Sequence, residues 1–199
     1  MAMQRINIKI SGINPLLQNN PQTVDPFNRF SKAKKKITNK RTGKTDDDLL
    51  ELGDIETESK IYFDDNLGVY VPATWLTESI ITNGYAIAKI GRQKMRGGLF
   101  ADNDKIALDY RSKNKVKTIT DIVKNPEFRH RMLLKQGPVR VPKDAPIFHE
   151  WSFETVLIFD DTVVDFGSLK NIIERSAQYG GFGDFRPTFG RGKAVVTNV

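Results

Sequence analysis

A glycine-rich stretch near the C-terminus holds the residues best suited to bind a phosphate group. The stretch "YGGFGDFRPTFGRGKAVV" combines glycine, phenylalanine and basic residues at a density that flexible linkers do not have. Glycine lets an anion approach the backbone N–H groups, and arginine forms two parallel hydrogen bonds to a phosphate. The predicted phosphate-binding residues are Gly181, Gly183, Arg186, Gly190, Arg191 and Lys193.

The phenylalanines of this stretch have two alternative roles. Phe182, Phe185 and Phe189 could stack on nucleic-acid bases. Alternatively, the glycines only allow a helix to pack tightly on a sheet, with the phenylalanines in the core. We expect at least one of the three to be buried in either case. The stretch is not a Walker loop, because the spacing is wrong and no Ser or Thr follows the lysine.

Two other segments are rich in basic residues. Residues 29–44 hold eight basic residues among sixteen, and an acidic run follows. Such charge blocks are typical of mobile or inserted segments, so residues 27–58 are interpreted as a charged insertion. It is either a solvated loop whose halves attract each other or an arm that grips phosphates. The predicted phosphate-binding residues of the arm are Lys34, Lys35, Lys36, Lys40 and Arg41; Arg129, Arg131, Lys135 and Arg140 form either a second patch or ordinary basic surface.

The sequence gives little indication of catalysis or metal binding. Its only histidines are His130 and His149, and the alternation around His149 predicts a core or sheet-face residue. The stretch "DNDK" lacks the glycine and the distal glutamate of a calcium loop. The absence of cysteine excludes disulfides and thiolate zinc sites. We therefore predict no catalytic residue, no metal site and no cofactor.

The overall composition favours a polyanionic partner. The 199 residues include 31 basic and 24 acidic ones, which gives a net charge of +7. Hydrophobic residues make up 39%, which is enough for a core. No apolar run approaches the roughly 18 residues of a membrane span, and the first residues do not form a signal-peptide pattern. We expect a cytoplasmic protein with no membrane partner.

Hydrophobic periodicity predicts an α+β fold. Residues 5–11 and 147–159 alternate as strands, and residues 61–71 read as a hairpin. Helices are expected from Thr74 and from Ser168, each taken as an N-cap, and a final strand follows the glycine-rich stretch. Residues 91–146 read as an irregular basic region with one or two strands. One more strand in the middle would complete a βαββαβ ferredoxin-like core within a single domain, residues 1–199.

Three pieces of the sequence resemble the RAMP superfamily, the proteins that build CRISPR effector backbones and bind guide RNA. The glycine-rich stretch is similar to the family's loop between its last helix and last strand. "INIKISGINPLL" looks like its first strand and the apolar turn after it, and "VYVPATWLTESI" like the start of its first helix. The resemblance implies a modified RNA-recognition fold with the loop close to phosphates. The short chain would suit a phage or mobile-element relative.

These observations predict a non-enzymatic protein that binds single-stranded RNA or DNA, largely without sequence preference. The glycine-rich stretch and the basic arm would hold phosphates, and copies would associate along the strand. One alternative is an RNA-processing endonuclease of the same fold, for which His130 is the residue to test. The other is a viral protein-binding module or inhibitor whose basic surface meets an acidic protein.

Overall fold

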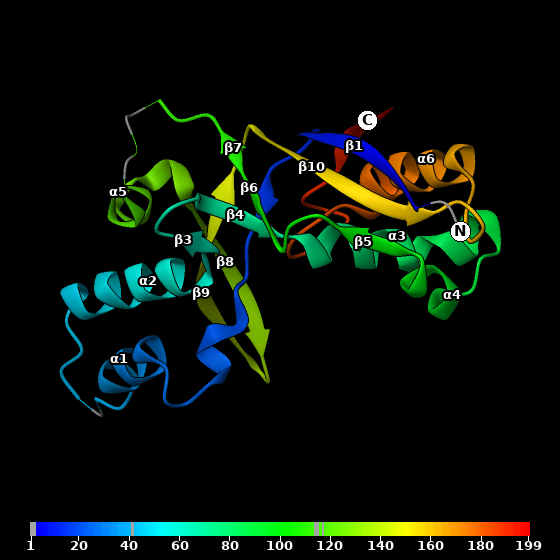
Figure 1. Ribbon diagram of the computed structural model, residues 1–199. Coiled ribbons are helices and arrows are strands. Elements are labelled where there is room, and N and C mark those ends of the chain that lie inside the picture. The colour runs from blue at the N-terminus through cyan, green and yellow to red at the C-terminus, as the bar shows by residue number, and fades with distance from the viewer. Residues whose placement is uncertain (1–2, 41, 114–115, 117) are drawn as a thin grey trace. The chain divides into compact units, whose positions relative to one another are not determined.

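The computed structural model describes residues 3–40, 42–113, 116 and 118–199 (Figure 1). It confirms an α+β fold with antiparallel sheets. Contacts divide the chain into two compact units. Unit 1 comprises Met1–Leu16, Asp64–Arg111 and His149–Val199, and unit 2 comprises Leu17–Phe63 and Ser112–Phe148.

The main sheet of unit 1 is antiparallel, with the strand order β11-β1-β10-β5. A further strand, β7, also pairs with β10. The alternation that predicted the first strand is confirmed, because Ile6, Ile8 and Ile10 are fully buried while Lys9 between them is exposed. The strands are β1 (Met3–Gly12), β5 (Leu99–Ala101), β7 (Asp109–Tyr110), β10 (Trp151–Asp160) and β11 (Gly192–Asn198).

Three helices complete the core of unit 1: α3 (Ala73–Ala88), α4 (Arg92–Gly97) and α6 (Phe166–Arg175). α3 and α6 contact each other, and α6 continues into a π-helical turn, η3 (Ser176–Gly180). α6 begins earlier than the sequence predicts, because the Asp165 carboxylate accepts the Ser168 N–H at 2.9 Å and is the N-cap. The α3 helix also begins before the predicted Thr74.

A small sheet holds the hairpin predicted at residues 61–71. Its order is β3-β4-β6, with β3 (Phe63–Asp64), β4 (Gly68–Pro72) and β6 (Lys105–Ala107). The Asp64 carboxylate fixes the turn, because it accepts the N–H groups of Asn66 and Leu67 at 3.0 and 3.2 Å. Lys105 and the turn hydrogen bonds lower the pKa of Asp64 to about 2.

Unit 2 combines helices with a three-stranded sheet of order β2-β9-β8. Strands β8 and β9 form a hairpin whose turn includes Gly137 at φ +60°. α2 packs on β9 and on α1. The elements are β2 (Leu16–Leu17), η1 (Pro21–Val24), α1 (Arg29–Thr38), α2 (Asp46–Lys60), α5 (Ile119–Lys124), η2 (Pro126–Phe128), β8 (Arg129–Gln136) and β9 (Val139–Phe148).

These elements differ from two expectations. Residues 27–58 were expected to be a solvated loop or an arm, yet they form α1 and α2, and α2 begins with a capping box between Thr45 and Asp48. Residues 91–146 were expected to hold one or two strands. In the described part of that region, α4, β5, β6, β7, α5 and β8 all occur, together with most of β9.

The core of unit 2 mixes apolar and charged side chains. Phe128 and Phe148 pack with ring centroids 5.6 Å apart, and Phe30 and Ile37 bury one side of α1. Glu56 and Asp144 are also buried, at 4% and 2% exposure. Buried carboxylates need partners, so the ion pairs around them are part of this core. None of the described helices has the length and apolar character needed to cross a membrane.

Candidate functional site

The glycines of the predicted phosphate loop allow two backbone segments to meet. Gly190 has φ +75°, and a Cβ placed on it would lie 1.8 Å from the carbonyl oxygen of Phe182. Gly181, at φ +71°, lies against the Gly190 backbone in the same way, and Gly183 also has a positive φ of +75°. A Cβ on Gly192 would lie 2.7 Å from the Cγ2 atom of Ile10. Close packing therefore accounts for Gly181, Gly190 and Gly192.

Several backbone N–H groups of the loop have hydrogen-bond acceptors inside unit 1. The Phe182 N–H donates to the Gly190 carbonyl at 2.8 Å, and the Gly190 N–H donates to the Pro15 carbonyl at 2.7 Å. The Gly181 N–H donates to the Ser176 carbonyl at 3.0 Å, and the Arg191 N–H to Asn14 Oδ1 at 2.7 Å. These four donors are occupied within the protein and are not available to an anion.

The expectation that at least one loop phenylalanine is buried is confirmed by Phe182. It has no exposed surface and packs edge-on against Trp151 and Phe153, with centroid distances of 6.4 and 5.5 Å. Phe189 is half-buried. Phe185 differs from both, because 42% of it is exposed, and it is the aromatic side chain of this loop most available to a ligand.

The basic side chains of the loop are exposed. This holds for Arg186, for Arg191 and for Lys193 on β11. Among the described residues, no carboxylate lies within ion-pair distance of any of the three. Their charges are therefore available to an external anion.

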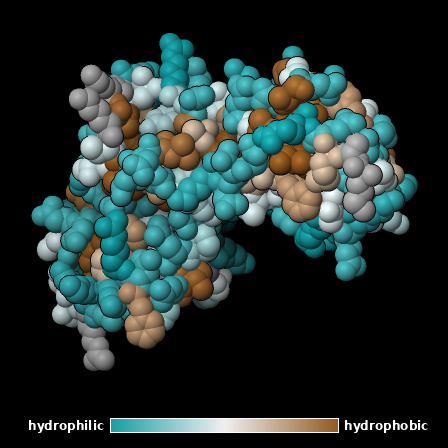
Figure 2. All heavy atoms as spheres, viewed as in Figure 1, coloured by the Kyte–Doolittle hydropathy of each residue, from teal (hydrophilic) through white to brown (hydrophobic). Residues whose placement is uncertain are grey.

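The net charge of the protein lies entirely in unit 2. Unit 2 holds eighteen basic and eleven acidic residues, whereas unit 1 holds thirteen of each. Hydrophilic side chains cover most of the visible surface over α1 and α2 (Figure 2). The charge balance of the whole chain could be predicted from the sequence, but its confinement to one unit follows from the fold.

Within unit 2, four of the predicted phosphate-binding residues have carboxylate partners. Lys34 pairs with Glu56 at 2.6 Å, and Lys40 pairs with Asp48 at 2.5 Å. Arg129 pairs with Asp54, and Arg131 donates two hydrogen bonds of 2.8 and 2.9 Å to the Asp144 carboxylate. Arg41 lies outside the described residues.

These ion pairs change the titration of the buried acids. Burial alone would raise the pKa of Glu56, but hydrogen bonds from Lys34, the Asp144 N–H and Lys143 outweigh it and hold that pKa below its ordinary value. The hydrogen bond from Lys40 lowers the pKa of Asp48. Burial lowers the pKa of Lys60. Glu56 is therefore a carboxylate that binds α2 to α1 and to β9.

The remaining cations of α1 lie on its outer face, defined here as Lys32, Lys35 and Lys36. All three are exposed, and none has an ion-pair partner in the described part of the chain. Lys35 and Lys36 follow Lys32 at i+3 and i+4, the spacing at which helical side chains are neighbours and like charges repel. Lys35 and Lys36 were among the predicted phosphate-binding residues. Lys32 was not, although its helical spacing from them could have identified it.

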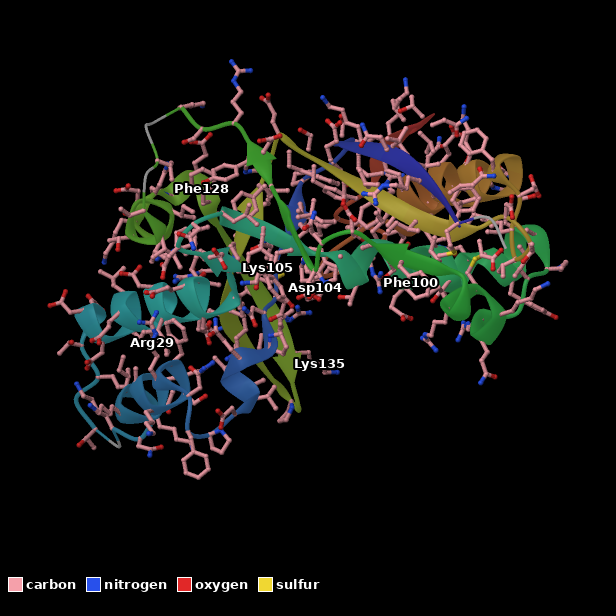
Figure 3. The ribbon with its side chains drawn as sticks, in the orientation of Figure 1. Arg29, Phe100, Asp104, Lys105, Phe128 and Lys135 are labelled. Atoms are coloured by element: carbon pink, nitrogen blue, oxygen red, sulfur yellow. The ribbon has the colours of Figure 1, made fainter. Side chains whose placement is uncertain are left out.

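The turn end of the β8–β9 hairpin repeats this pattern. Lys135 (Figure 3) lies directly opposite Arg140 in the strand register. Both residues are exposed. Like charges directly opposite each other destabilise an antiparallel pair. Leu133 and Val139 beside them are 61% and 56% exposed. Arg29 (Figure 3), the first residue of α1, by contrast pairs with Glu58 of α2 at 3.0 Å.

The two histidines belong to different units. His130 is half-buried on β8 of unit 2. His149 was expected within a strand, but it is exposed in the bend between β9 and β10, and the strand begins at Trp151. No group of three or more His, Asp or Glu side chains is arranged to hold a metal ion in the portion of the chain that the structure describes.

No protein-family model matches this sequence, and no curated protein matches it significantly. The residues of the chain itself therefore carry the functional argument.

Proposed function

We propose that this protein binds single-stranded nucleic acid without catalysing a reaction on it, largely independently of base sequence. One observation carries the proposal. All of the excess positive charge belongs to unit 2, where part of it is arranged as like-charge neighbours with no neutralising carboxylate among the described residues. The neighbours are the outer face of α1 and the pair formed by Lys135 and Arg140.

Such an arrangement costs stability in the free protein. Each like-charge pair on a helix surface is unfavourable by about 0.2–0.5 kcal/mol, and a directly opposed pair in a sheet by a similar amount. Elsewhere in unit 2, carboxylates neutralise Lys34, Lys40 and Arg131. A phosphate backbone beside the remaining cations would convert repulsion into attraction and release counterions. Binding of a polyanionic ligand would therefore offset the destabilisation that these like-charge neighbours cause in the free protein.

Unit 1 would contribute a second set of contacts. Arg186, Arg191 and Lys193 offer cations, and Phe185 offers an exposed ring on which a base could stack. Because Gly181, Gly190 and Gly192 serve close packing and four N–H groups of the loop are occupied, the side chains would make the main contacts with the ligand.

We also propose that unit 1 has a ferredoxin-like βαββαβ core related to the RAMP superfamily. In chain order the elements β1, α3, β5, β10, α6 and β11 follow that pattern, and the antiparallel order β11-β1-β10-β5 supports it. The glycine-rich stretch follows the second helix and precedes the last strand, as the resemblance implies. A domain of this size covers few nucleotides, so copies would line up along a strand.

Fluorescence anisotropy across a salt series, with labelled single-stranded DNA and RNA of equal length, tests the proposal. The variant Lys32→Gln/Lys35→Gln/Lys36→Gln removes three charges from unit 2, and Arg92→Gln/Lys94→Gln/Lys170→Gln removes three from unit 1. The first should lower the salt slope by about 2, at about 0.7 per phosphate contact, and the second should leave it unchanged. If neither oligonucleotide binds at low salt, the proposal fails and the protein-binding module becomes the better explanation.

A further inference from the structure

We infer that unit 2 contains a binding site for a single phosphate group, in a cavity of about 270 Å³ between α2, α5 and β8. Asp54, Val123, Lys124, Pro126, Arg129 and Arg131 line it. The inference rests on the proposed function in one respect, the identity of the molecule that would carry the phosphate. The site itself follows from the side chains of the cavity.

A glycine in α2 makes room for this cluster. A Cβ on Gly53 would lie 2.5 Å from Asp144 Oδ2, 3.3 Å from Arg131 Nη2 and 3.4 Å from Arg129 Nη1. Glycine in a helix interior is less stable than alanine, and here it allows two guanidinium groups to approach the same point of the helix. Arg129 and Arg131 reach that point together because side chains two residues apart share one face of a strand.

Cations outnumber carboxylates in this cluster. Asp54 is shared between Lys124 and Arg129, and Glu56 is shared between Lys34 and Lys143. The Asp144 carboxylate pairs with Arg131, and the Asp144 backbone carbonyl accepts a hydrogen bond from Lys60 Nζ. The charged residues that line the cavity itself are three cations, Lys124, Arg129 and Arg131, and one carboxylate, Asp54. Asp144, the partner of Arg131, adds a second carboxylate. Glu127 is near in sequence, but its carboxylate accepts from Ser112 and the Lys113 N–H. The three cations at the cavity therefore exceed the two carboxylates by one positive charge, which favours an anionic ligand.

Donors remain for that ligand. A guanidinium has five N–H donors. Arg131 uses Nε and Nη2 on Asp144, and Arg129 uses Nη2 on Asp54 and the Val123 carbonyl. The other guanidinium nitrogens have no acceptor among the described residues. The Lys124 side chain is 68% exposed at the end of α5. The cavity thus has donors from two positions on β8 and from α5, and a guanidinium group can form two parallel hydrogen bonds to phosphate oxygens.

The phosphate could come from a nucleic-acid backbone or from free phosphate, and the experiment separates these sources. Amide chemical shifts are followed by NMR during titration with inorganic phosphate, with sodium chloride at matched ionic strength as the reference. Shifts should saturate at Gly53, Lys124 and Arg129. Lys124→Gln should weaken the affinity about tenfold, as expected for one lost charge-assisted hydrogen bond, and Lys32→Gln should not. Lys124→Gln should fold, because Asp54 keeps Arg129 as its partner.

The second arm measures oligonucleotide binding by the same variants. If a strand supplies the phosphate, Lys124→Gln lowers the salt slope by about 0.7, and inorganic phosphate competes with the oligonucleotide. If free phosphate is the ligand, the slope does not change; both results support the site. Absence of saturable shifts at the cavity, with oligonucleotide binding intact, overturns the phosphate site and leaves the proposed function standing. Phosphate binding without oligonucleotide binding supports the phosphate site and overturns the proposed function.

Discussion

Replacing Gly190 by alanine should destabilise unit 1 far more than the same change at another glycine of similar backbone conformation. Gly190 and Gly68 have φ of +75° and +78°, so a methyl group strains both to a similar degree, by about 1–2 kcal/mol. Around Gly68 an added Cβ meets nothing within 4 Å, whereas at Gly190 it would lie 1.8 Å from the Phe182 carbonyl oxygen. Gly68→Ala is therefore a matched control.

The extra cost at Gly190 follows from the contacts that must move. Backbone atoms cannot rotate away, so the two segments must separate. The hydrogen bond from the Phe182 N–H to the Gly190 carbonyl and the one from the Gly190 N–H to Pro15 would then be lost, at about 1 kcal/mol each. Gly190→Ala should cost about 4 kcal/mol in total, about 2 more than Gly68→Ala.

Urea unfolding followed by tryptophan emission measures this difference directly. Both tryptophans, Trp75 and Trp151, belong to unit 1, and Trp151 packs against Phe182. The transition should therefore report the unit that contains the glycine loop. Equal destabilisation by Gly190→Ala and Gly68→Ala would refute the reasoning that close backbone packing selects glycine at position 190.

Two further predictions concern the buried acid of unit 2 and the exposed ring of the glycine loop. Because the ion pairs hold the pKa of folded Glu56 below its unfolded value, its stabilising contribution is present above about pH 4.5 and is lost as the pH falls through the folded pKa. Glu56→Gln should lower the free energy of unfolding by about 3 kcal/mol at pH 7, since it leaves Lys34 and Lys143 without their shared carboxylate. Urea unfolding followed by circular dichroism between pH 7 and pH 3 should show that the free energy of unfolding depends less on pH in the variant than in the wild type. An unchanged pH dependence would contradict this. Phe185→Ala should alter the free energy of unfolding by less than about 0.5 kcal/mol and weaken single-strand binding by about 1–3 kcal/mol in anisotropy titrations; unchanged affinity would exclude base stacking on this ring.

Much of unit 1 could be predicted from the sequence because its elements have simple periodicity. The buried residues Ile6, Ile8 and Ile10 alternate in β1, and Leu169, Ile172 and Ile173 lie at helical spacing in α6. The role of the glycines could not be decided in this way. Gly190 meets Phe182 through a turn of the chain, and Pro15 accepts its N–H from the opposite end of the sequence.

Unit 2 was harder to predict because its core includes polar and charged side chains besides apolar ones. The buried residues of α2 are Asp48, Gly53, Glu56, Thr57 and Ser59, which form no apolar stripe. The two carboxylates among them pair with cations from outside the helix, Asp48 with Lys40 and Glu56 with Lys34 and Lys143. Lys143 lies 87 residues from Glu56 in the sequence. Basic residues predicted as phosphate ligands from local density alone could therefore not be separated into ion-paired and available ones.

Lys32→Glu tests with two readouts whether the like-charge neighbours of unit 2 serve to bind a polyanion. The variant replaces two repulsions, with Lys35 and Lys36, by two attractions at i+3 and i+4. It should stabilise the free protein by about 1 kcal/mol while lowering both the affinity for single-stranded nucleic acid and its salt slope, the slope by at least about 0.7. Higher stability with weaker binding is the predicted result. Unchanged affinity and slope in a folded Lys32→Glu protein would contradict the account.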